Sequence, residues 1–208
     1  MEIQPDSSPT RAAQRDARRA QILAVGLELF VRRGYSATRV ADIADAAQMS
    51  TGLLFHYFPS KKDLYEELVR TGLARSTATV SMADASDALA YFDGVATTVI
   101  GGMRASRFVA RMFVLISRAD ADAVLGEDVV SRATLDALDR SATIIRSGQE
   151  AGTVRRGDPL ALATAFWGAL QGAAQLVALS ENIPCPEPAW IVDLLRPVVP
   201  RDDERSDS

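Results

Sequence analysis

The sequence predicts an all-α protein made of two helical parts, and three observations carry this prediction. Apolar residues recur at helical spacing along most of the 208 residues. No segment alternates apolar and polar residues at period two for long, and runs of β-branched residues are short. Helix-ending signals such as Gly34 and Gly152 separate the periodic segments. We expect domains over residues 11–75 and 76–199, a disordered lead at 1–10 and a disordered tail at 200–208.

The first part is expected to begin with two helices of unequal length. An apolar stripe that includes Ile22 and Phe30 runs through residues 11–33, and Gly34 ends this helix. A short second helix follows over residues 38–47, with Thr38 as a suitable N-cap because its hydroxyl can accept a backbone N–H.

Two further helices complete this part. A three-residue break, Gln48 to Ser50, leads into a third helix of about two turns, Thr51 to Phe58. Ser60 and Asp63 then form a capping box at the start of a fourth helix, which continues towards Leu73.

The second part follows a polar connection of small residues, 76–87, and its helices are longer and amphipathic. Gly152 ends the third of them, and a loop with three prolines precedes the last. We expect these helices to span residues 88–103, 106–118, 127–151, 158–179 and 189–199.

The scarcity of cysteine and histidine excludes most metal and nucleophilic chemistry. Cys185 and His56 are each the only residue of their type, so neither a Cys/His zinc site nor an internal disulfide framework is expected. A reducing cytoplasm is the natural compartment. Carboxylate pairs such as Asp120 and Asp122 lie in loops or at helix starts, where they act as caps. We therefore expect no enzyme, no metal and no cofactor.

One stretch of 22 uncharged residues, 159–180, is long enough to cross a membrane. It contains Thr164, Gln171 and Gln175 and is rich in alanine and glycine rather than leucine and isoleucine. This composition favours a helix buried against protein. Residues 1–19 are polar and rich in arginine, so we expect neither a secretory signal nor a membrane partner.

Charge is spread unevenly along the chain, whose net charge is −4. Residues 11–75 carry 11 Arg and Lys against 7 Asp and Glu, a net of +4, so the remainder is acidic. A basic front end is compatible with a polyanionic partner and equally with a solvated helical face.

The short helices of the first part are typical of a helix-turn-helix motif, whose second helix enters the DNA major groove. Ser50 and Thr51 place hydroxyl and N–H groups at a helix N-terminus, which favours a phosphate. Gly52 permits close approach to a duplex, and Leu53 and Phe55 are suited to thymine methyl groups. The residues suited to phosphate contacts are His56, Tyr57 and Lys61.

Residues 18–69 resemble the N-terminal domain of TetR-type (tetracycline-repressor-like) regulators. The most specific match is Gly52-x-Leu54-Phe55-His56-Tyr57-Phe58-Pro59-Ser60-Lys61, followed by Leu64. The earlier matches are Ile22-Leu23 with Leu29-Phe30, Gly34-Tyr35, Thr38 and Val40, Ile43-Ala44, and Met49-Ser50. The remaining two-thirds is similar to the family only in architecture, as helices that hold a ligand pocket and a dimer interface.

The resemblance implies that residues 50–57 form the recognition helix, while Leu54 and Phe58 belong to the core. Thr38 and Arg39 would touch the DNA backbone, and Lys61 would bind a phosphate. The expected DNA-binding residues are Thr38, Arg39, Ser50, Thr51, Gly52, Leu53, Phe55, His56, Tyr57 and Lys61.

Four residues depart from the family's pattern. Phe55 stands where tyrosine is usual, Leu53 where a small polar residue is common, and Gly26 where alanine is usual. Gln48 stands where glycine is common, and holding it in the left-handed region costs ~1–2 kcal/mol. The first two departures favour a more apolar readout of the bases.

The resemblance also implies an effector pocket and a two-subunit four-helix bundle in the second part. Met and aromatic residues at helical spacing more often form a plain core, but the resemblance implies that some of them line a cavity. The expected pocket residues are Phe92, Met103, Phe108, Met112, Phe113, Ile144, Trp167 and Gln171. Helices 158–179 and 189–199 would form the interface through Ala165, Gly168, Ala169, Gly172, Ala173, Ile191, Leu194 and Leu195.

Together these expectations describe a bacterial, cytoplasmic, homodimeric transcriptional regulator. It would act as a repressor that binds a palindromic operator on double-stranded DNA and is released by an unknown small-molecule effector. The alternative is a small-molecule-binding protein of the same fold without operator binding, and a gel shift with competitor DNA separates the two.

Overall fold

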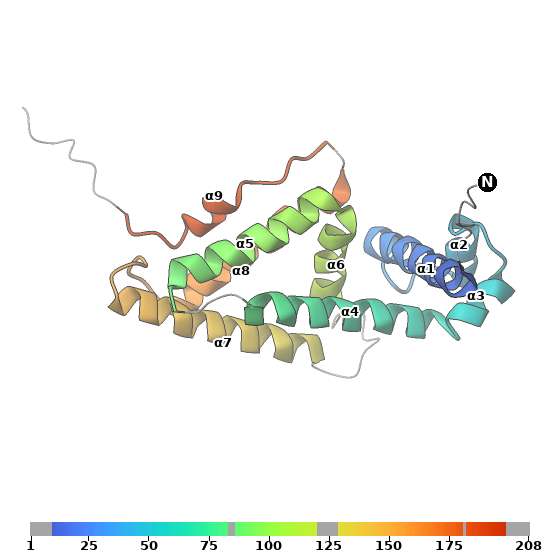
Figure 1. Ribbon diagram of the computed structural model, residues 1–208, viewed down its shortest axis with the longest axis horizontal. Helices are drawn as coiled ribbons and strands as arrows, with labels where there is room; N and C mark the ends of the chain where they lie inside the picture. Colours follow the sequence, from blue (N-terminus) through green and yellow to red (C-terminus); the bar gives the residue numbers. More distant parts are fainter. Residues whose placement is uncertain (1–9, 83–85, 120–128, 181, 199–208) are drawn as a thin grey trace, which may run out of the picture.

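The computed structural model describes residues 10–82, 86–119, 129–180 and 182–198, and no residue in these ranges lies in a strand. The helices are α1 (Arg11–Arg33), α2 (Val40–Ala46), α3 (Thr51–Tyr57), α4 (Lys61–Met82), α5 (Ala88–Ala105), α6 (Arg107–Arg118), α7 (Val129–Glu150), α8 (Pro159–Leu179) and α9 (Pro188–Val192). Figure 1 shows α1 to α3 at one end, α5 and α7 to α9 at the other, and α4 and α6 between them. The predicted all-α fold is confirmed.

Side-chain caps begin several of these helices, because an oxygen of the preceding residue accepts an otherwise unpaired backbone N–H. The Thr10 hydroxyl accepts from Ala13 at 3.2 Å, so residue 10 belongs to the cap of α1 rather than to the disordered lead predicted for 1–10. The Ser60 hydroxyl accepts from the Asp63 N–H at 3.2 Å, which confirms Ser60 as the predicted cap of α4.

Three predicted helix boundaries are wrong. α4 continues to Met82, through much of the polar connection predicted at 76–87. Arg39, not Thr38, precedes α2 as its N-cap residue. α9 ends at Val192 rather than at the predicted residue 199. Turns with hydrogen bonds between residues three positions apart follow it, and Pro197 disfavours a helical conformation at Arg196. The predicted start of the seventh helix at Glu127 lies outside the described residues.

The first hydrophobic core joins α1, α2, α3 and α4. Phe30, Tyr35 and Tyr65 pack with ring centroids 5.0 to 5.8 Å apart, and Leu54 and Phe58 are buried beside this cluster, as predicted. The second core joins α5, α7, α8 and α9.

α6 contributes to both cores and therefore links the two parts. Its Ala110 lies in the second core, whereas Met112 and Leu115 lie in the first. At Gly72 of α4 the helices approach so closely that an added Cβ would lie 2.6 Å from Ile116 Cδ1 and 2.8 Å from Met112 Sδ. Any larger residue at this position would require the Ile116 and Met112 side chains to shift.

Polar contacts also hold α6 against α1. Arg111 forms an ion pair with Glu28 at 3.2 Å, and Arg111 is largely buried. Arg118 donates to the carbonyl of Val31 at 3.0 Å. The position of α1 is thus fixed by α6 as well as by α4.

The turn between α2 and α3 sets the direction of α3. The N–H of Met49 donates to the Ala44 carbonyl at 3.0 Å, a bond that closes the end of α2 as in a Schellman motif. Gln48 has a φ of 54°, the position usually held by glycine in such turns. The structure therefore contains the strained, left-handed glutamine that the sequence comparison with the family suggested.

We expect Gln48→Gly to raise the free energy of unfolding by up to about 1 kcal/mol, because glycine adopts positive φ without a Cβ clash. The control is Gln14→Gly on exposed α1, where φ is helical and glycine should lower the free energy of unfolding. Urea denaturation of both variants measures the difference. Destabilisation by both substitutions would show that the turn stores no strain.

Candidate nucleic-acid interface and effector domain

α3 buries one side in the first core and exposes the rest. Leu54 is buried, whereas Thr51, Gly52 and His56 are exposed and Tyr57 is half-buried. Leu53 and Phe55 are exposed to 42% and 46%, which is high for large apolar side chains. Six of the predicted DNA-binding residues, Ser50, Thr51, Gly52, Leu53, Phe55 and His56, are therefore brought together on one exposed surface.

Ser50 anchors the start of α3. Its hydroxyl accepts the N–H of Leu53 at 3.2 Å, so it acts as the helix cap. The adjoining Gly52 faces open space, since the nearest atom to a Cβ added there is Ser50 Oγ at 4.0 Å. Glycine lowers the stability of a helix by about 1 kcal/mol relative to alanine, and no internal packing explains its presence at this position.

Thr38 does not lie on this surface, which corrects the expectation that it touches the DNA backbone. Its side chain is 1% exposed, and its hydroxyl donates to the carbonyl of Gly34 at 2.7 Å. Arg39 is exposed, and its N–H donates to the Asp42 carboxylate at 3.2 Å. The hydroxyl of Thr38 turns inward because the chain between α1 and α2 leaves carbonyl groups that need a donor.

Lys61 is positioned by the domain itself. Its ammonium donates to the carbonyls of Tyr35 and Thr38 at 2.8 and 2.9 Å and lies 4.1 Å from the centroid of the Tyr35 ring. Two of its three N–H donors are thus engaged, and one is left for a phosphate. The sequence did not indicate this internal role, because no local pattern links Lys61 to residues 23 or more positions away.

Arg19 likewise has an internal role that the sequence did not indicate. Its guanidinium pairs with Glu67 of α4 through two hydrogen bonds and lies 4.9 Å from the centroid of the Phe58 ring. Arg33 pairs with Asp42 at 3.2 Å. Arg11, Arg15, Arg18 and Arg39 have no ion-pair partner among the described residues, so they are cations of this end that remain for an anion.

The predicted effector-pocket residues divide between the two cores. Phe92, Met103 and Ile144 are buried in the second core, with Phe113 and Trp167 packed at its edge. Phe108 and Met112 instead pack with the first core. The remaining residue, Gln171, is half-buried. Helical spacing placed all these residues on apolar faces but did not show which core each face meets.

The second core contains a polar group without a partner. Tyr91 is 1% exposed, and its hydroxyl has no hydrogen-bond partner in the described parts of the chain. Burial raises the pKa of Tyr91, and the nearby Arg140 partly offsets that rise, so the hydroxyl stays neutral. Elsewhere in this core the Trp167 indole donates to the buried Ser141 hydroxyl at 3.0 Å. The Tyr91 hydroxyl is therefore an unused donor and acceptor inside an aromatic cluster.

The predicted dimer interface is also divided. Ile191 and Leu195 are buried in the second core of their own chain, so they are not available to a partner, and this assignment is wrong. Leu194 is 38% exposed. On α8, Ala165 and Gly168 are exposed, and Ala169, Gly172 and Ala173 are half-buried.

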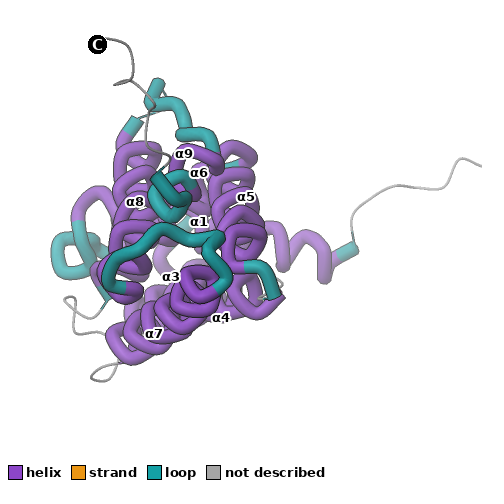
Figure 2. The backbone as a smooth tube through the Cα atoms, turned by 90° about the vertical axis from the view of Figure 1, so that its left-hand side faces the viewer, coloured by secondary structure: helices purple, strands orange, loops and turns teal. Residues whose placement is uncertain are grey.

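α8 has one buried and one exposed apolar face. Ala163, Phe166, Leu170, Ala174 and Val177 lie in the core, so the prediction of a helix buried against protein holds for one side only. Figure 2 shows α8 and α5 on opposite sides of this part, with α9 above and α7 below. Leu176 and Leu179 of this helix remain exposed. By length and composition alone, α8 is also long and apolar enough to cross a membrane.

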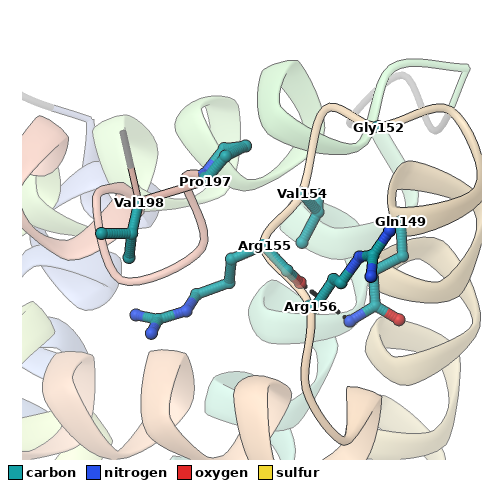
Figure 3. Close-up of a pocket in the computed structure, with 7 residues that line it drawn as sticks. All are labelled: Gln149, Gly152, Val154, Arg155, Arg156, Pro197 and Val198. Carbon is teal, nitrogen blue, oxygen red and sulfur yellow. Dashed lines mark hydrogen bonds between the residues drawn. The ribbon is translucent and has the colours of Figure 1, made fainter. Parts of the chain in front are cut away.

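A cavity of about 520 Å³ opens at the connection between α7 and α8. Its lining residues are Gln149, Gly152, Val154, Arg155, Arg156, Pro197 and Val198. Figure 3 shows that the two guanidinium groups point in opposite directions, that of Arg156 beside Gln149 and that of Arg155 below Val198. None of the predicted pocket residues lines this cavity.

Comparison with known proteins finds sequence similarity confined to the first part. Residues 22–68 match the family model described as bacterial regulatory proteins, tetR family. The transcriptional repressor KstR2 of Mycobacterium tuberculosis is 42% identical over 59 residues, 28% of this chain and 30% of that protein. The transcriptional activator FasR of Mycolicibacterium smegmatis is 47% identical over 51 residues, 24% of this chain and 23% of that protein. The match thus spans less than a third of either relative.

Solved structures match over most of the chain. Apo AibR has a TM-score of 0.68 at 18% identity, covering 86% of this chain and 98% of that chain. KstR2 of Mycobacterium tuberculosis also has a TM-score of 0.68, at 19% identity, covering 86% and 95%. AibR in complex with isovaleryl coenzyme A and operator DNA has a TM-score of 0.61 at 16% identity, covering 85% and 94%. The TM-scores show a shared fold, and at these identities they show the fold alone. With the family-model match at residues 22–68, the predicted resemblance to TetR-type regulators is confirmed.

We expect Tyr91→Phe to raise the free energy of unfolding by about 1 kcal/mol, because it removes an unpaired buried hydroxyl. The control, Thr38→Val, removes a buried hydroxyl that is paired and should lower the free energy of unfolding by a similar amount. Thermal and urea denaturation of the purified variants measure both effects. A loss of stability in Tyr91→Phe would mean that its hydroxyl is satisfied within the unliganded protein.

Proposed function

We propose that this TetR-type chain is a ligand-responsive transcriptional regulator that binds operator DNA as a homodimer in the bacterial cytoplasm and acts as a repressor. The observation that carries the proposal is α3, a two-turn helix fixed by Leu54 and Phe58 that exposes all residues from Thr51 to His56 apart from Leu54. A helix presented in this way fits a major groove, whose width admits one α-helix. The matches to named repressors and regulators support the same function.

Contacts to the DNA backbone would come from groups around α3. The N-terminus of α3 offers unpaired N–H groups, the third N–H of Lys61 remains open, and Arg15 and Arg39 are unpaired among the described residues. Such contacts fix the position of a protein on DNA but carry no sequence information. They do make binding strongly dependent on salt.

Two copies of the chain would pair through the exposed apolar face of α8. This face contains Ala165, Gly168 and Gly172, whose small size permits close helix approach, and the exposed Leu176. α7 packs beside α8, so two copies of this pair would form a four-helix bundle. A two-fold axis would set the recognition helices against half-sites about 34–36 Å apart.

An effector held in the second core would act on DNA binding through α6. The neighbouring AibR structure contains isovaleryl coenzyme A together with operator DNA, which supports a small-molecule effector here. Because α6 belongs to both cores, a shift of α6 moves α4 and α1 through Gly72 and Arg111. A change in operator occupancy from about 99:1 to 1:99 requires about 5.5 kcal/mol of differential binding.

The experiment that tests this function is binding of the purified protein to DNA upstream of its own gene, with competitor present. We expect a footprint over an inverted repeat that survives competitor, with affinity lost at least about 10³-fold between 50 and 200 mM salt. Absence of specific binding to this DNA and to fragments selected from the whole genome would favour the alternative function, a small-molecule-binding protein of the same fold that binds no operator.

Gly52→Ala should separate folding from DNA binding. We expect it to raise the free energy of unfolding by up to about 1 kcal/mol while weakening DNA binding at least tenfold, since the new methyl group keeps α3 from the duplex. Gly94→Ala on α5, also exposed with open space, is the control that should stabilise without changing DNA affinity. If Gly52→Ala and Gly94→Ala bound DNA with equal affinity, α3 would not be part of the DNA interface.

Leu176→Arg should raise the dimer dissociation constant at least about tenfold, because it places two like charges near the two-fold axis of an apolar interface. The monomer should keep its helical content, since Leu176 is exposed in the chain. Thr97→Arg on the exposed face of α5 is the control with an unchanged constant. Analytical ultracentrifugation measures both, and a tight Leu176→Arg dimer would place the interface elsewhere.

A further inference from the structure

We propose that α3 identifies its operator through thymine methyl groups, with Leu53 and Phe55 as the residues that contact them. The inference rests on the proposed function and names what the DNA must present to this helix: two C5-methyl groups in each half-site. It goes beyond general DNA binding, because it assigns base recognition to apolar contact rather than to hydrogen bonds.

The side chains of α3 support this assignment by their chemistry. The helix reads Thr51-Gly52-Leu53-Leu54-Phe55-His56-Tyr57 and contains no Arg, Lys, Asn or Gln. Bidentate readout of guanine uses arginine or lysine, and bidentate readout of adenine uses asparagine or glutamine. Neither mode is open to α3. The apolar feature that the major groove offers is the methyl group of thymine.

The geometry of the helix supports the same contacts. Successive residues of an α-helix are rotated by about 100°, so Leu53 and Phe55 lie on either side of the inward-facing Leu54. Gly52 and His56 occupy the outermost line between them. Gly52 has no side chain, and a Cβ added there would meet only Ser50 Oγ, at 4.0 Å. The outer surface of α3 is therefore low at this residue, and the helix can approach the groove until both flanking side chains reach base edges.

The exposure of the two side chains supports a partner at this place. Leu53 and Phe55 are 42% and 46% exposed on a helix of seven residues, and the first core is closed beneath them by Leu54 and Phe58. They lie at the opposite end of the molecule from α8, so the proposed dimer does not cover them (Figure 1). A thymine methyl removes apolar surface from water on both sides of the contact.

The test uses duplexes selected from a random library with the full-length protein. Each thymine of the selected operator is replaced in turn by uracil, which differs only in lacking the methyl group. At the contacted positions we expect binding to weaken about fourfold for one half-site and about fifteenfold for both, since one buried methyl group contributes about 0.8 kcal/mol.

A double-mutant cycle assigns each methyl group to a side chain. Leu53→Ala should weaken binding to the thymine operator and abolish the effect of uracil at one position, and Phe55→Ala should do so at another. His56→Ala, on the outermost line of the same helix, is the control and should keep both uracil effects. All three side chains are exposed, so circular dichroism should show unchanged folding.

The outcomes distinguish the inference from the proposed function. Failure to select any duplex overturns the proposed function itself. A selected operator whose binding is unchanged by uracil at every position, or whose uracil effects persist in both Leu53→Ala and Phe55→Ala, overturns the inference while leaving the function standing. The inference is supported if the effect of uracil at one position disappears only in Leu53→Ala and the effect at another position disappears only in Phe55→Ala.

Discussion

The contact of α4 with α6 at Gly72 is the constraint on which the rest of the structure depends. A Cβ at residue 72 would lie within 3 Å of side-chain atoms of Met112 and Ile116. The backbone of α4 therefore packs directly against these two side chains of α6. α6 can therefore place residues in both hydrophobic cores, and it also holds α1 through Arg111 and Arg118. The two parts of the molecule are consequently joined through a shared helix, α6, rather than by a flexible linker. Close packing of this kind transmits displacement because protein interiors have few voids to absorb it.

The elements around α3 are joined to one another by a second set of contacts that are mostly polar and distant in sequence. Lys61 binds two carbonyls of the α1–α2 connection, Arg19 joins α1 to α4 over Phe58, and Gln21 donates to the Ala47 carbonyl at 3.1 Å. These bonds supply partners for backbone groups that the turns leave open. Several basic residues of this end thus stabilise the fold, so its positive charge overstates what is free to meet an anion.

The sequence predicted local features of this protein well and long-range ones poorly. Caps such as Ser50 and Ser60 and the inward direction of Leu54 and Phe58 follow from residues within a few positions of one another. The left-handed Gln48 follows from the family's usual glycine at that position. What the sequence did not predict concerns partners. Met112 and Phe108 lie on an apolar face, but periodicity does not say that this face meets α4, and Ile191 and Leu195 appear free until α5 covers them. Thr38 fits the composition of an N-cap, yet the carbonyl of Gly34 competes successfully for its hydroxyl.

If the chain is the dimeric regulator proposed above, the exposed apolar face of α8 affects gene control at low protein abundance. If operator binding requires two chains joined through this face, the population of competent protein rises with the square of chain concentration while monomers predominate. A cell that halves its supply of the chain would then lose about three-quarters of the binding species. The strength of a helix-to-helix contact far from DNA would in this way set a threshold in copy number, below which the target promoter is left unoccupied whatever the effector level.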